Sequence, residues 1–316
     1  MPVVGMGTFG SDHIDAKTMG EAVLGALQVG YRHIDGAAVY ANEKEVGEAV
    51  RAAIAGGVKR EELFLTSKLW NDKHAVKDVI PACEQSLKNL GLDHVDCYLI
   101  HWPLPNFHPP GCDVHYIDPN ARAYDNDRYL ETWGELVKLQ KQGKVRAIGT
   151  SSMTIAKFKQ FLPKCGVRPA VNQLELHPHF QQPELFDYLV AEKIQPVGFC
   201  PLGSPNRPER DRTPGDTVDM EDPVVVGIAK RMGVHPATVC LKWALGRGAV
   251  TIPFSPVRHE YLSNIRAALP PHLADEDMAA LSKIDKGCRL VKGQVFCWRK
   301  SQSWEDLWDE NGTITQ

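Results

Sequence analysis

The strongest constraint on the fold is an alternation of short apolar runs with segments of helical periodicity that continues along the chain. The runs are bounded by turn residues, which is typical of buried strands. They lie near 3–6, 31–35, 63–68, 95–100, 145–149, 169–173, 195–199 and 249–253. Strands that alternate with helices form parallel sheets. Eight such units predict an α/β fold, a (β/α)8 TIM barrel, in preference to an open doubly wound sheet.

No Ser/Gly/Pro-rich linker and no shift of composition divides the 316 residues, so we expect a single domain over residues 1–316. A minimal barrel needs about 250 residues. The surplus falls mainly into a Pro-rich loop at 102–127 after the fourth strand, a loop at 203–221 after the seventh strand, and a C-terminal tail at 287–316. We expect these three segments to shape the substrate site.

The helices are expected between the strands, with apolar residues on one face of each. Asn42 followed by Glu45 predicts a capping box at the start of the second helix. The last long helical segment is broken at 233–236. The expected helices lie near 19–27, 42–54, 76–90, 130–142, 154–162, 182–192 and 222–245.

Composition excludes several classes of partner. The formal net charge is −3 and the Lys and Arg residues form no dense cluster, so we expect neither a nucleic-acid partner nor an anionic membrane surface. The chain shows no secretory signal pattern and no stretch of about 18 apolar residues. Its eight cysteines are scattered without a Cys-x-x-Cys pair. These features predict a cytoplasmic protein whose partner is a small molecule.

Three glycines near the start, Gly5, Gly7 and Gly10, spell the Gly-x-Gly-x-x-Gly fingerprint of a dinucleotide-binding Rossmann unit. Asp35 ends the next expected strand, where such a unit places its ribose-binding acid. However, residues 11–14 separate the third glycine from the following helix, whereas the fingerprint should open the helix directly. We therefore interpret the glycines as the first barrel strand and its turn.

Four polar residues fall where expected strands end and the following loops begin, which is where barrels carry their chemistry. Asp35, Lys68 and His101 end the second, third and fourth strands, and Tyr40 follows Asp35 in the next loop. Each alone is more often structural. Together they suit carbonyl reduction: a nearby ammonium makes proton release from a phenol easier, a carboxylate keeps the ammonium charged, and an imidazole hydrogen-bonds the substrate oxygen. A hydride donor is still required.

Motifs around these residues resemble those of the aldo-keto reductases over about residues 2 to 290. They are GYRHID at 30–35, YANEKEVG at 40–47, LTSKLW at 65–70, YLIHWP at 98–103, GKVRAIG at 143–149, PAVNQLELHP at 169–178 and PLGS at 201–204. The resemblance implies an oxidoreductase that reduces an aldehyde or ketone with hydride from NAD(P)H bound across the barrel mouth. It implies that Asp35, Tyr40, Lys68 and His101 are the catalytic tetrad, with Tyr40 as general acid, and that the protein is a monomer.

The resemblance also assigns contacts to the cofactor and the substrate. Ser151, Ser152 and Gln173 match the positions that hold the nicotinamide carboxamide, although the family usually has Ser-Asn-Phe where this chain has Ser-Ser-Met. Phe199 stands where a tyrosine usually stacks on the nicotinamide ring, and stacking survives loss of a hydroxyl. Leu202 and Ser204 match the loop over the pyrophosphate. The implied substrate contacts are Phe9, Trp70, His101 and Trp102.

The largest departure from the family follows the eighth strand, at the expected site of the adenosine 2′-phosphate. Phe254 replaces a lysine beside Ser255, and Glu260 replaces an arginine, while Asn264 is retained. A carboxylate repels a phosphate but accepts a hydrogen bond from a ribose hydroxyl. The departure predicts that NADH serves at least as well as NADPH, with Arg258 left open as a displaced phosphate contact.

Two rival interpretations, a metal site and a binding protein without turnover, fit parts of the sequence. Glu175, His177 and His179 suggest a metal site, because a His-x-His pair on a strand shares one face. Pro178 interrupts that pair and the resemblance covers the motif without a metal, so no metal is expected. A cofactor-sensing barrel without turnover is a second functional class, although such a binder needs no proton donor. The polar 102–127 loop favours a sugar or polyol-derived carbonyl, and the tail aromatics either cap the pocket or pack on the barrel.

Overall fold

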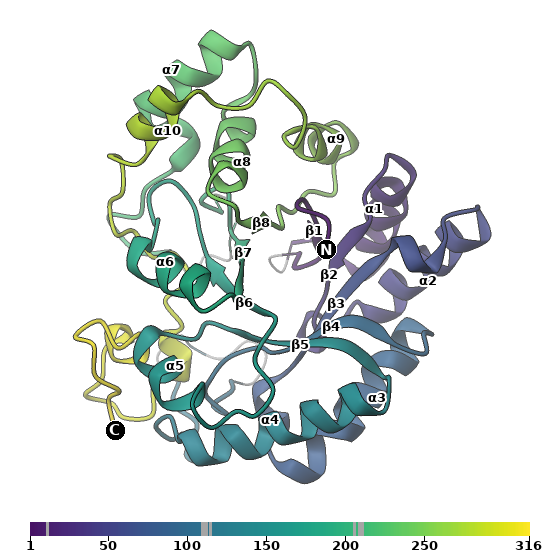
Figure 1. Ribbon diagram of the computed structural model, residues 1–316, viewed down its shortest axis with the longest axis vertical. Helices are drawn as coiled ribbons and strands as arrows, with labels where there is room; N and C mark the ends of the chain where they lie inside the picture. Colours follow the sequence, from purple (N-terminus) through teal and green to yellow (C-terminus); the bar gives the residue numbers. More distant parts are fainter. Residues whose placement is uncertain (11–12, 109–112, 114–115, 205–206, 208–211) are drawn as a thin grey trace.

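Eight parallel strands, within the part of the chain that the computed structural model describes, form one sheet whose spatial order follows the sequence (Figure 1). The described residues are 1–10, 13–108, 113, 116–204, 207 and 212–316. Parts of the predicted loops at 102–127 and 203–221 therefore lie outside them. The strands are β1 Met6–Gly7, β2 His33–Asp35, β3 Phe64–Leu69, β4 Val95–Ile100, β5 Val145–Ser151, β6 Val171–Glu175, β7 Gln195–Phe199 and β8 Val250–Thr251.

The sheet closes between its first and last strands. Val4 forms a parallel bridge with Thr251, and the Gly5 amide donates to the Thr251 carbonyl at 2.8 Å. The Gly7 amide donates to the Pro253 carbonyl at 3.0 Å, and a Cβ at Gly7 would lie 3.0 Å from the Ile252 carbonyl oxygen. This close approach explains a glycine in β1 without a Rossmann turn. The closed order confirms the predicted (β/α)8 barrel.

Helices cover the outside of the sheet (Figure 1). They are α1 Ala16–Gln28, α2 Glu43–Ala55, α3 Val76–Leu90, α4 Asn126–Lys141, α5 Ile155–Phe161, α6 Pro183–Ala191, α7 Pro223–Met232, α8 Pro236–Gly246, α9 Arg258–Arg266 and α10 Asp275–Leu281. The sequence pattern did not predict α9 and α10. Among the described residues, no single helix has the length and apolar character to cross a membrane; α7 and α8 meet that test only as a pair bent by 97°.

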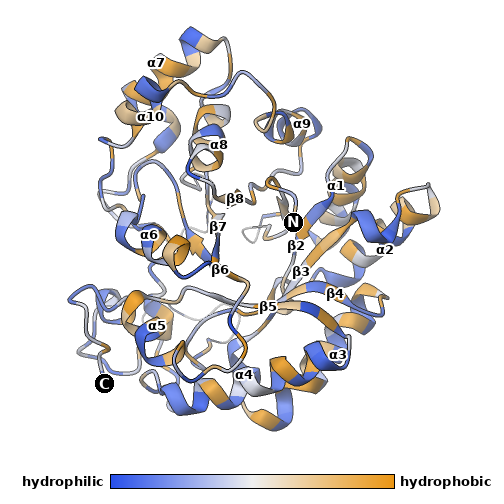
Figure 2. Cartoon of the chain, in the orientation of Figure 1, coloured by the Kyte–Doolittle hydropathy of each residue, from blue (hydrophilic) through white to orange (hydrophobic). Residues whose placement is uncertain are grey.

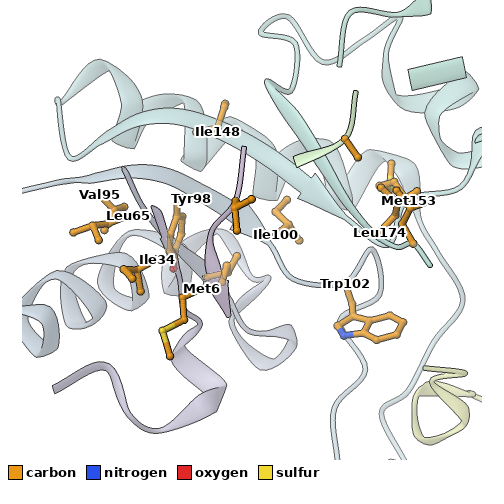
Figure 3. Close-up of a cluster of buried hydrophobic side chains, with 14 of the residues drawn as sticks. Met6, Ile34, Leu65, Val95, Tyr98, Ile100, Trp102, Ile148, Met153 and Leu174 are labelled. Atoms are coloured by element: carbon orange, nitrogen blue, oxygen red, sulfur yellow. The ribbon is translucent and has the colours of Figure 1, made fainter. Parts of the chain in front are cut away.

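Strand periodicity divides the apolar core into two layers. In β4, Cys97 and Leu99 belong to the cluster inside the barrel, whereas Tyr98 and Ile100 pack in the layer between strands and helices. Figure 3 shows Tyr98 close to Ile34 and Leu65 of neighbouring strands. In Figure 2, α3 and α4 carry both hydrophobic and hydrophilic colour along their length, as expected of helices with one buried face.

The predicted capping box at Asn42 is wrong, although α2 does begin at the next residue. The Asn42 side chain makes no cap bond and instead donates from Nδ2 to the Thr8 carbonyl at 2.8 Å. Thr8 in turn donates from its hydroxyl to the Asp35 carbonyl at 2.9 Å. The Asn42 side chain, which the local pattern assigns to the helix end, therefore bonds to a distant residue at the barrel mouth instead.

A buried histidine and its carboxylate partners join the end of β6, the loop after β7 and the C-terminal tail. His177 lies after β6, with Nδ1 2.9 Å from Asp219 Oδ1 in the loop after β7 and Nε2 3.0 Å from Glu175 Oε1. The same Glu175 carboxylate accepts bonds from the amides of Leu290 and Val291 in the C-terminal tail. Burial lowers the pKa of His177, but the two carboxylates outweigh burial and raise this pKa to about 9. His177 is therefore a buried cation at neutral pH.

The raised pKa of His177 predicts that the folded protein loses stability as the pH rises above neutral. Its pKa in the folded chain is raised above the unfolded value of about 6.5, so its stabilisation is complete below pH 6.5 and is lost as the pH rises to about 9. We expect the free energy of unfolding, measured with urea, to fall by a few kcal/mol across this window.

The variant His177→Gln should be less stable than the parent at pH 6.5, and its free energy of unfolding should depend much less on pH in this window. His259→Gln, at an exposed position on α9, is the matched control and should keep it. An unchanged slope in His177→Gln would show that another group titrates in this window.

Candidate active site

The four residues of the sequence-predicted tetrad lie at the carboxyl ends of β2, β3 and β4. Asp35 is the last residue of β2, and Lys68 is the penultimate residue of β3. His101 follows β4 directly, and its amide donates to the Leu69 carbonyl at 3.1 Å. Tyr40 ends a short 3-10 turn, Ala38–Tyr40, after β2. Parallel register brings these strand ends to one rim of the barrel.

Lys68 is the centre of this group and is fully buried. Its ammonium donates to the Asp35 carboxylate, to the Gly36 carbonyl at 2.9 Å and to the Tyr40 hydroxyl at 3.4 Å. Burial alone lowers the pKa of Lys68, but the attraction of Asp35, followed by Tyr40, outweighs it and leaves this pKa raised. Lys68 therefore carries its charge beside the phenol.

Two opposing effects act on the pKa of the Tyr40 hydroxyl. Burial raises the pKa of the Tyr40 hydroxyl, and the Lys68 ammonium lowers it by a smaller amount, so the pKa stays above its ordinary value. The expected effect of the ammonium is present, but desolvation of the phenolate exceeds it. The hydroxyl consequently holds its proton at neutral pH.

His101 is neutral in this setting. Burial lowers the pKa of its imidazole well below the ordinary range, and repulsion from Lys68 lowers it further. Its ring lies edge-on to Tyr40, with ring centroids 5.7 Å apart, and to Trp70 at 5.2 Å. Its buried Nδ1 atom has no hydrogen-bond partner among the residues that the structure describes. A neutral imidazole carries one N–H that can donate to an oxygen.

Three predicted cofactor residues come together on β5 and β6. Ser151 pairs with Gln173 across the two strands, and the Ser152 amide donates to the Gln173 carbonyl at 2.8 Å. Gln173 also donates from Nε2 to Asp35 Oδ2 at 2.7 Å. Sequence reasoning missed this bond, because residues 138 positions apart share no local pattern. Gln173 thus connects the predicted carboxamide site with the tetrad.

The predicted residues after β7 lie in a tight turn. Phe199 is the last residue of β7, and Leu202 and Ser204 follow in the turn, where the Gly203 amide donates to the Cys200 carbonyl at 3.0 Å. Gly203 has a φ of 71°, and a Cβ there would lie 2.1 Å from the Asp219 carboxylate. Only glycine fits both this backbone and this close contact.

The predicted residues after β8 form a separate group around the start of α9. The Ser255 hydroxyl donates to the Glu260 carboxylate at 2.5 Å, and the Val257 amide donates to the Ser255 hydroxyl at 3.0 Å. Asn264 is buried one turn further along α9, and Phe254 is partly buried. The structure therefore brings the serine and the unusual carboxylate into direct contact.

Aromatic side chains stand beside the tetrad. Phe9 lies 5.2 Å from Tyr40, and Phe296 lies 6.0 Å from Trp70 and 4.6 Å from Trp102, measured between ring centroids. Figure 3 shows Trp102 apart from the strand side chains, on the loop after β4. Sequence reasoning did not assign Phe296 to the site, since its only signal was the aromatic character of the tail.

Trp102 is a predicted substrate contact. In the structure, its ring also packs against the C-terminal tail. It is buried, and its ring lies 5.5 Å from that of Trp308. The guanidinium of Arg289 stacks 3.6 Å from the Trp308 ring on the same side of the barrel. Phe296 and Trp308 are both buried and pack on Trp102, so these tail aromatics pack on the barrel.

The residues weighed as a metal site bond to protein groups. His177 lies between Glu175 and Asp219, and His179 contacts the Thr217 hydroxyl at 2.7 Å and the Asp222 carboxylate at 3.0 Å. Among the residues that the structure describes, no three His, Cys, Asp or Glu side chains are grouped to hold a metal ion.

Comparison with known proteins agrees with this geometry. The model of the Aldo/keto reductase family matches residues 3–286. Aldo-keto reductase family 1 member A1-A of Danio rerio is 40% identical over 293 residues, covering 92% of this chain and 88% of that protein. An aldo/keto reductase of Synechocystis sp. is 38% identical over 315 residues, covering 98% and 94%. Aldo-keto reductase family 1 member A1 of Homo sapiens is 39% identical, covering 92% and 88%. The chain belongs to the aldo/keto reductase family.

Proposed function

We propose that this protein reduces an aldehyde or ketone to the alcohol with hydride from NAD(P)H, and that Tyr40 donates the proton. The observation that carries the proposal is the buried Lys68 ammonium held between the Asp35 carboxylate and the Tyr40 hydroxyl. A fully buried ammonium is expensive unless it is paired. Pairing it with a phenol at the rim of a barrel suits a site where a phenolate forms and must be stabilised.

The residues at the rim fit a nicotinamide cofactor. The Gln173 side chain donates from Nε2 to Asp35, so its Oε1 atom can accept a bond from a carboxamide. The Ser151 hydroxyl lies on the neighbouring strand. The partly exposed Phe199 ring offers a stacking surface at the end of β7. When bound, the cofactor supplies the hydride.

The protonation states of the side chains suit carbonyl reduction. The neutral His101 imidazole donates a hydrogen bond to the substrate oxygen and orients the carbonyl. The Tyr40 hydroxyl, which holds its proton, transfers it to the alkoxide oxygen, and the Lys68 ammonium stabilises the phenolate that remains. Asp35 keeps Lys68 charged and in place, and Gln173 fixes the second oxygen of Asp35.

The substrate pocket that we propose has aromatic walls made by Phe9, Trp70 and Phe296. Such walls accept the apolar face of an aldehyde, a ketone or a sugar ring, so a sugar or polyol-derived carbonyl stays within the proposal. We also propose that residues 1–316 act as one domain, since the tail that carries Phe296 is bonded to the barrel through Glu175.

Removal of the Tyr40 hydroxyl tests the mechanism. Tyr40→Phe should lower kcat for an aldehyde by about a hundredfold or more, because general acid catalysis is worth about 10²–10⁴-fold. Its affinity for the cofactor should stay within about twofold of the parent, since the ring that contacts Phe9 is kept. Turnover is followed by nicotinamide absorbance over a panel of aldehydes, ketoses and alditols, run in both directions.

Tyr188→Phe, at a partly exposed position on α6, is the matched control and should behave like the parent. Retention of full activity in Tyr40→Phe would contradict the assigned proton donor. A parent protein that binds the cofactor tightly but turns over no member of the panel would instead support a cofactor-sensing barrel.

We also propose that the protein uses NADH at least as well as NADPH. The support is the Glu260 carboxylate, which is bonded to Ser255 and would repel a 2′-phosphate held by that serine, and the apolar Phe254 in place of a cation. Arg258 is exposed at the first turn of α9 and is the alternative phosphate contact. A ribose hydroxyl, by contrast, can donate to Glu260.

The double variant Phe254→Lys with Glu260→Arg should shift the ratio of kcat/KM toward NADPH by about tenfold or more, since a charge-assisted contact to a phosphate is worth 1.4 kcal/mol or above. The parent ratio is measured under the same conditions. A hundredfold preference of the parent for NADPH would defeat the proposal, and its loss in Arg258→Met would then identify Arg258 as the phosphate contact.

A further inference from the structure

Tyr40 lies on a short segment, residues 36–43, that leads from β2 into the first residue of α2. We call it the Tyr40 segment. Its first residue is bonded to β3 twice, since the Gly36 amide donates to the Thr66 carbonyl at 2.9 Å and the Gly36 carbonyl accepts a bond from the Lys68 ammonium at 2.9 Å. The start of the Tyr40 segment is therefore fixed to the strand that carries Lys68.

A buried carboxylate fixes the other end of the Tyr40 segment to the same strand. Glu43, the first residue of α2, accepts a bond from the Ser67 hydroxyl at 2.8 Å and a second bond from Asn89 Nδ2 at 3.1 Å. Glu43 and Ser67 are both buried, so water does not compete for their bond. Ser67 directly precedes Lys68, so adjacent residues of β3 bond the two ends of the segment.

The backbone of the Tyr40 segment is strained at the residue after Tyr40. Ala41 has a φ of 54° and a ψ of 26°, in the left-handed region that residues other than glycine seldom adopt. Such a conformation persists only where the surrounding contacts impose it. The contacts that follow Ala41 are the bond from Asn42 Nδ2 to the Thr8 carbonyl at 2.8 Å and the bond to Glu43. These bonds therefore hold a turn that the chain alone disfavours.

Packing between α2 and β3 is not solid at this point. A cavity of about 10 Å³ lies there, and its lining includes Gly36, Asn42, Glu43 and Ser67. Protein interiors leave few such gaps, and the atoms around a gap lose packing contacts. Directional hydrogen bonds, more than side-chain packing, therefore set the distance between the Tyr40 segment and β3.

The close approach of α2 to α3 supports the same arrangement. A Cβ at Gly47, one turn after Glu43 on α2, would lie 2.3 Å from the Leu90 carbonyl oxygen at the end of α3. Only glycine permits this contact, which brings Asn89, the neighbour of Leu90, to the Glu43 carboxylate. Glu43 is thus held by groups of two other elements, β3 and α3.

The hydrogen bond from Lys68 to Tyr40 is long enough to be lost by a small shift of the segment. The Tyr40 hydroxyl lies 3.4 Å from the Lys68 ammonium, beyond the usual length of such a bond. Displacement of a reacting group by about 1 Å costs roughly a hundredfold in rate. The bonds that hold the Tyr40 segment to β3 therefore bear directly on the rate of proton transfer.

We propose that Glu43 and Ser67 are positioning residues that set the place of the Tyr40 hydroxyl relative to Lys68. The inference rests on the proposed function, since it concerns how the proton donor is held. Glu43 acts through the backbone of the Tyr40 segment. Loss of its bond to Ser67 lets the strained turn at Ala41 relax and moves the hydroxyl away from the ammonium.

The test separates the bond from the size of the side chain. Glu43→Met keeps the length but removes the acceptor, whereas Glu43→Gln keeps an oxygen for Ser67. Glu43→Met and Ser67→Ala should each lower kcat for the best aldehyde of the panel by about tenfold, as a displacement of a fraction of an ångström implies. KM for the aldehyde and Kd for the cofactor should stay within about twofold of the parent. Glu43→Gln should keep most of the parent kcat.

Ala41→Gly tests the strained turn itself. Glycine adopts the left-handed region without strain, so the turn then needs less support. Combined with Glu43→Met, it should recover most of the lost kcat. Lys193→Gly is the matched control, because Lys193 is exposed, has a φ of 58° and lies between α6 and β7. It relieves the same kind of strain elsewhere and should recover no activity.

Glu48→Met, at an exposed position on α2, should keep the parent kcat. Urea unfolding of each variant establishes that it is folded in the assay, and Ser67→Ala decides the outcome if Glu43→Met does not fold. Parent kcat in the folded variants at Glu43 and Ser67 would overturn the proposal. A recovery of kcat that is absent with Ala41→Gly, or equal with Lys193→Gly, would also overturn it.

A readout that needs no turnover separates this proposal from the proposed function. The protein is labelled with fluorotyrosine, and the fluorine NMR resonance of Tyr40 is assigned by its loss in Tyr40→Phe. This resonance should move in Glu43→Met and Ser67→Ala and keep its parent position in Glu43→Gln and Glu48→Met. Such movement in a protein without turnover would support the positioning role and reject the reductase. Turnover with an unmoved resonance in every variant would do the reverse.

Discussion

The ion pair between Lys68 and Asp35 is the constraint on which the rest of the site depends. An ammonium with no exposed surface requires an anion, and that anion requires its own partners. Asp35 meets the need because Gln173 of β6 bonds its second oxygen at 2.7 Å, from strands that are not neighbours in the sheet. Such a contact needs the sheet to curve back on itself. Closure of the barrel between β1 and β8 is thus a condition for a stable charge at the rim, and not only a feature of the architecture.

Much of the fold was predictable because strands and helices differ in period. The runs at 95–100 and 195–199 coincide with β4 and β7, since each is a short, mainly apolar segment that follows a helix. The ends were less accurate: β1 and β8 are only two residues long, because pairing at the closing seam is limited to single bridges. Helix α9 escaped prediction because its sequence RHEYLSNIR has little apolar face.

The positions of Asp35, Tyr40, Lys68 and His101 were predictable for a similar reason, since each adjoins the end of an expected strand. Their electrostatics were not. The net pKa shift of Tyr40 depends on how deeply the phenol is enclosed, and burial is a property of the assembled barrel. The bond from Gln173 to Asp35 was missed, and the role of Phe296 was left open, because each contact brings together residues more than a hundred positions apart. Local pattern carries no information at that separation.

The seam that closes the barrel has a consequence for biosynthesis. Residues 4–7 are made before the other strands of the barrel, yet their partners at 251–253 are made about 245 residues later. Until then the edge of β1 that faces β8 has no partner, and unpaired strand edges are prone to association with other chains. Closure of the barrel therefore requires an encounter between segments far apart in the sequence, and a nascent chain halted before Thr251 has every component of the tetrad but no closed wall to hold it.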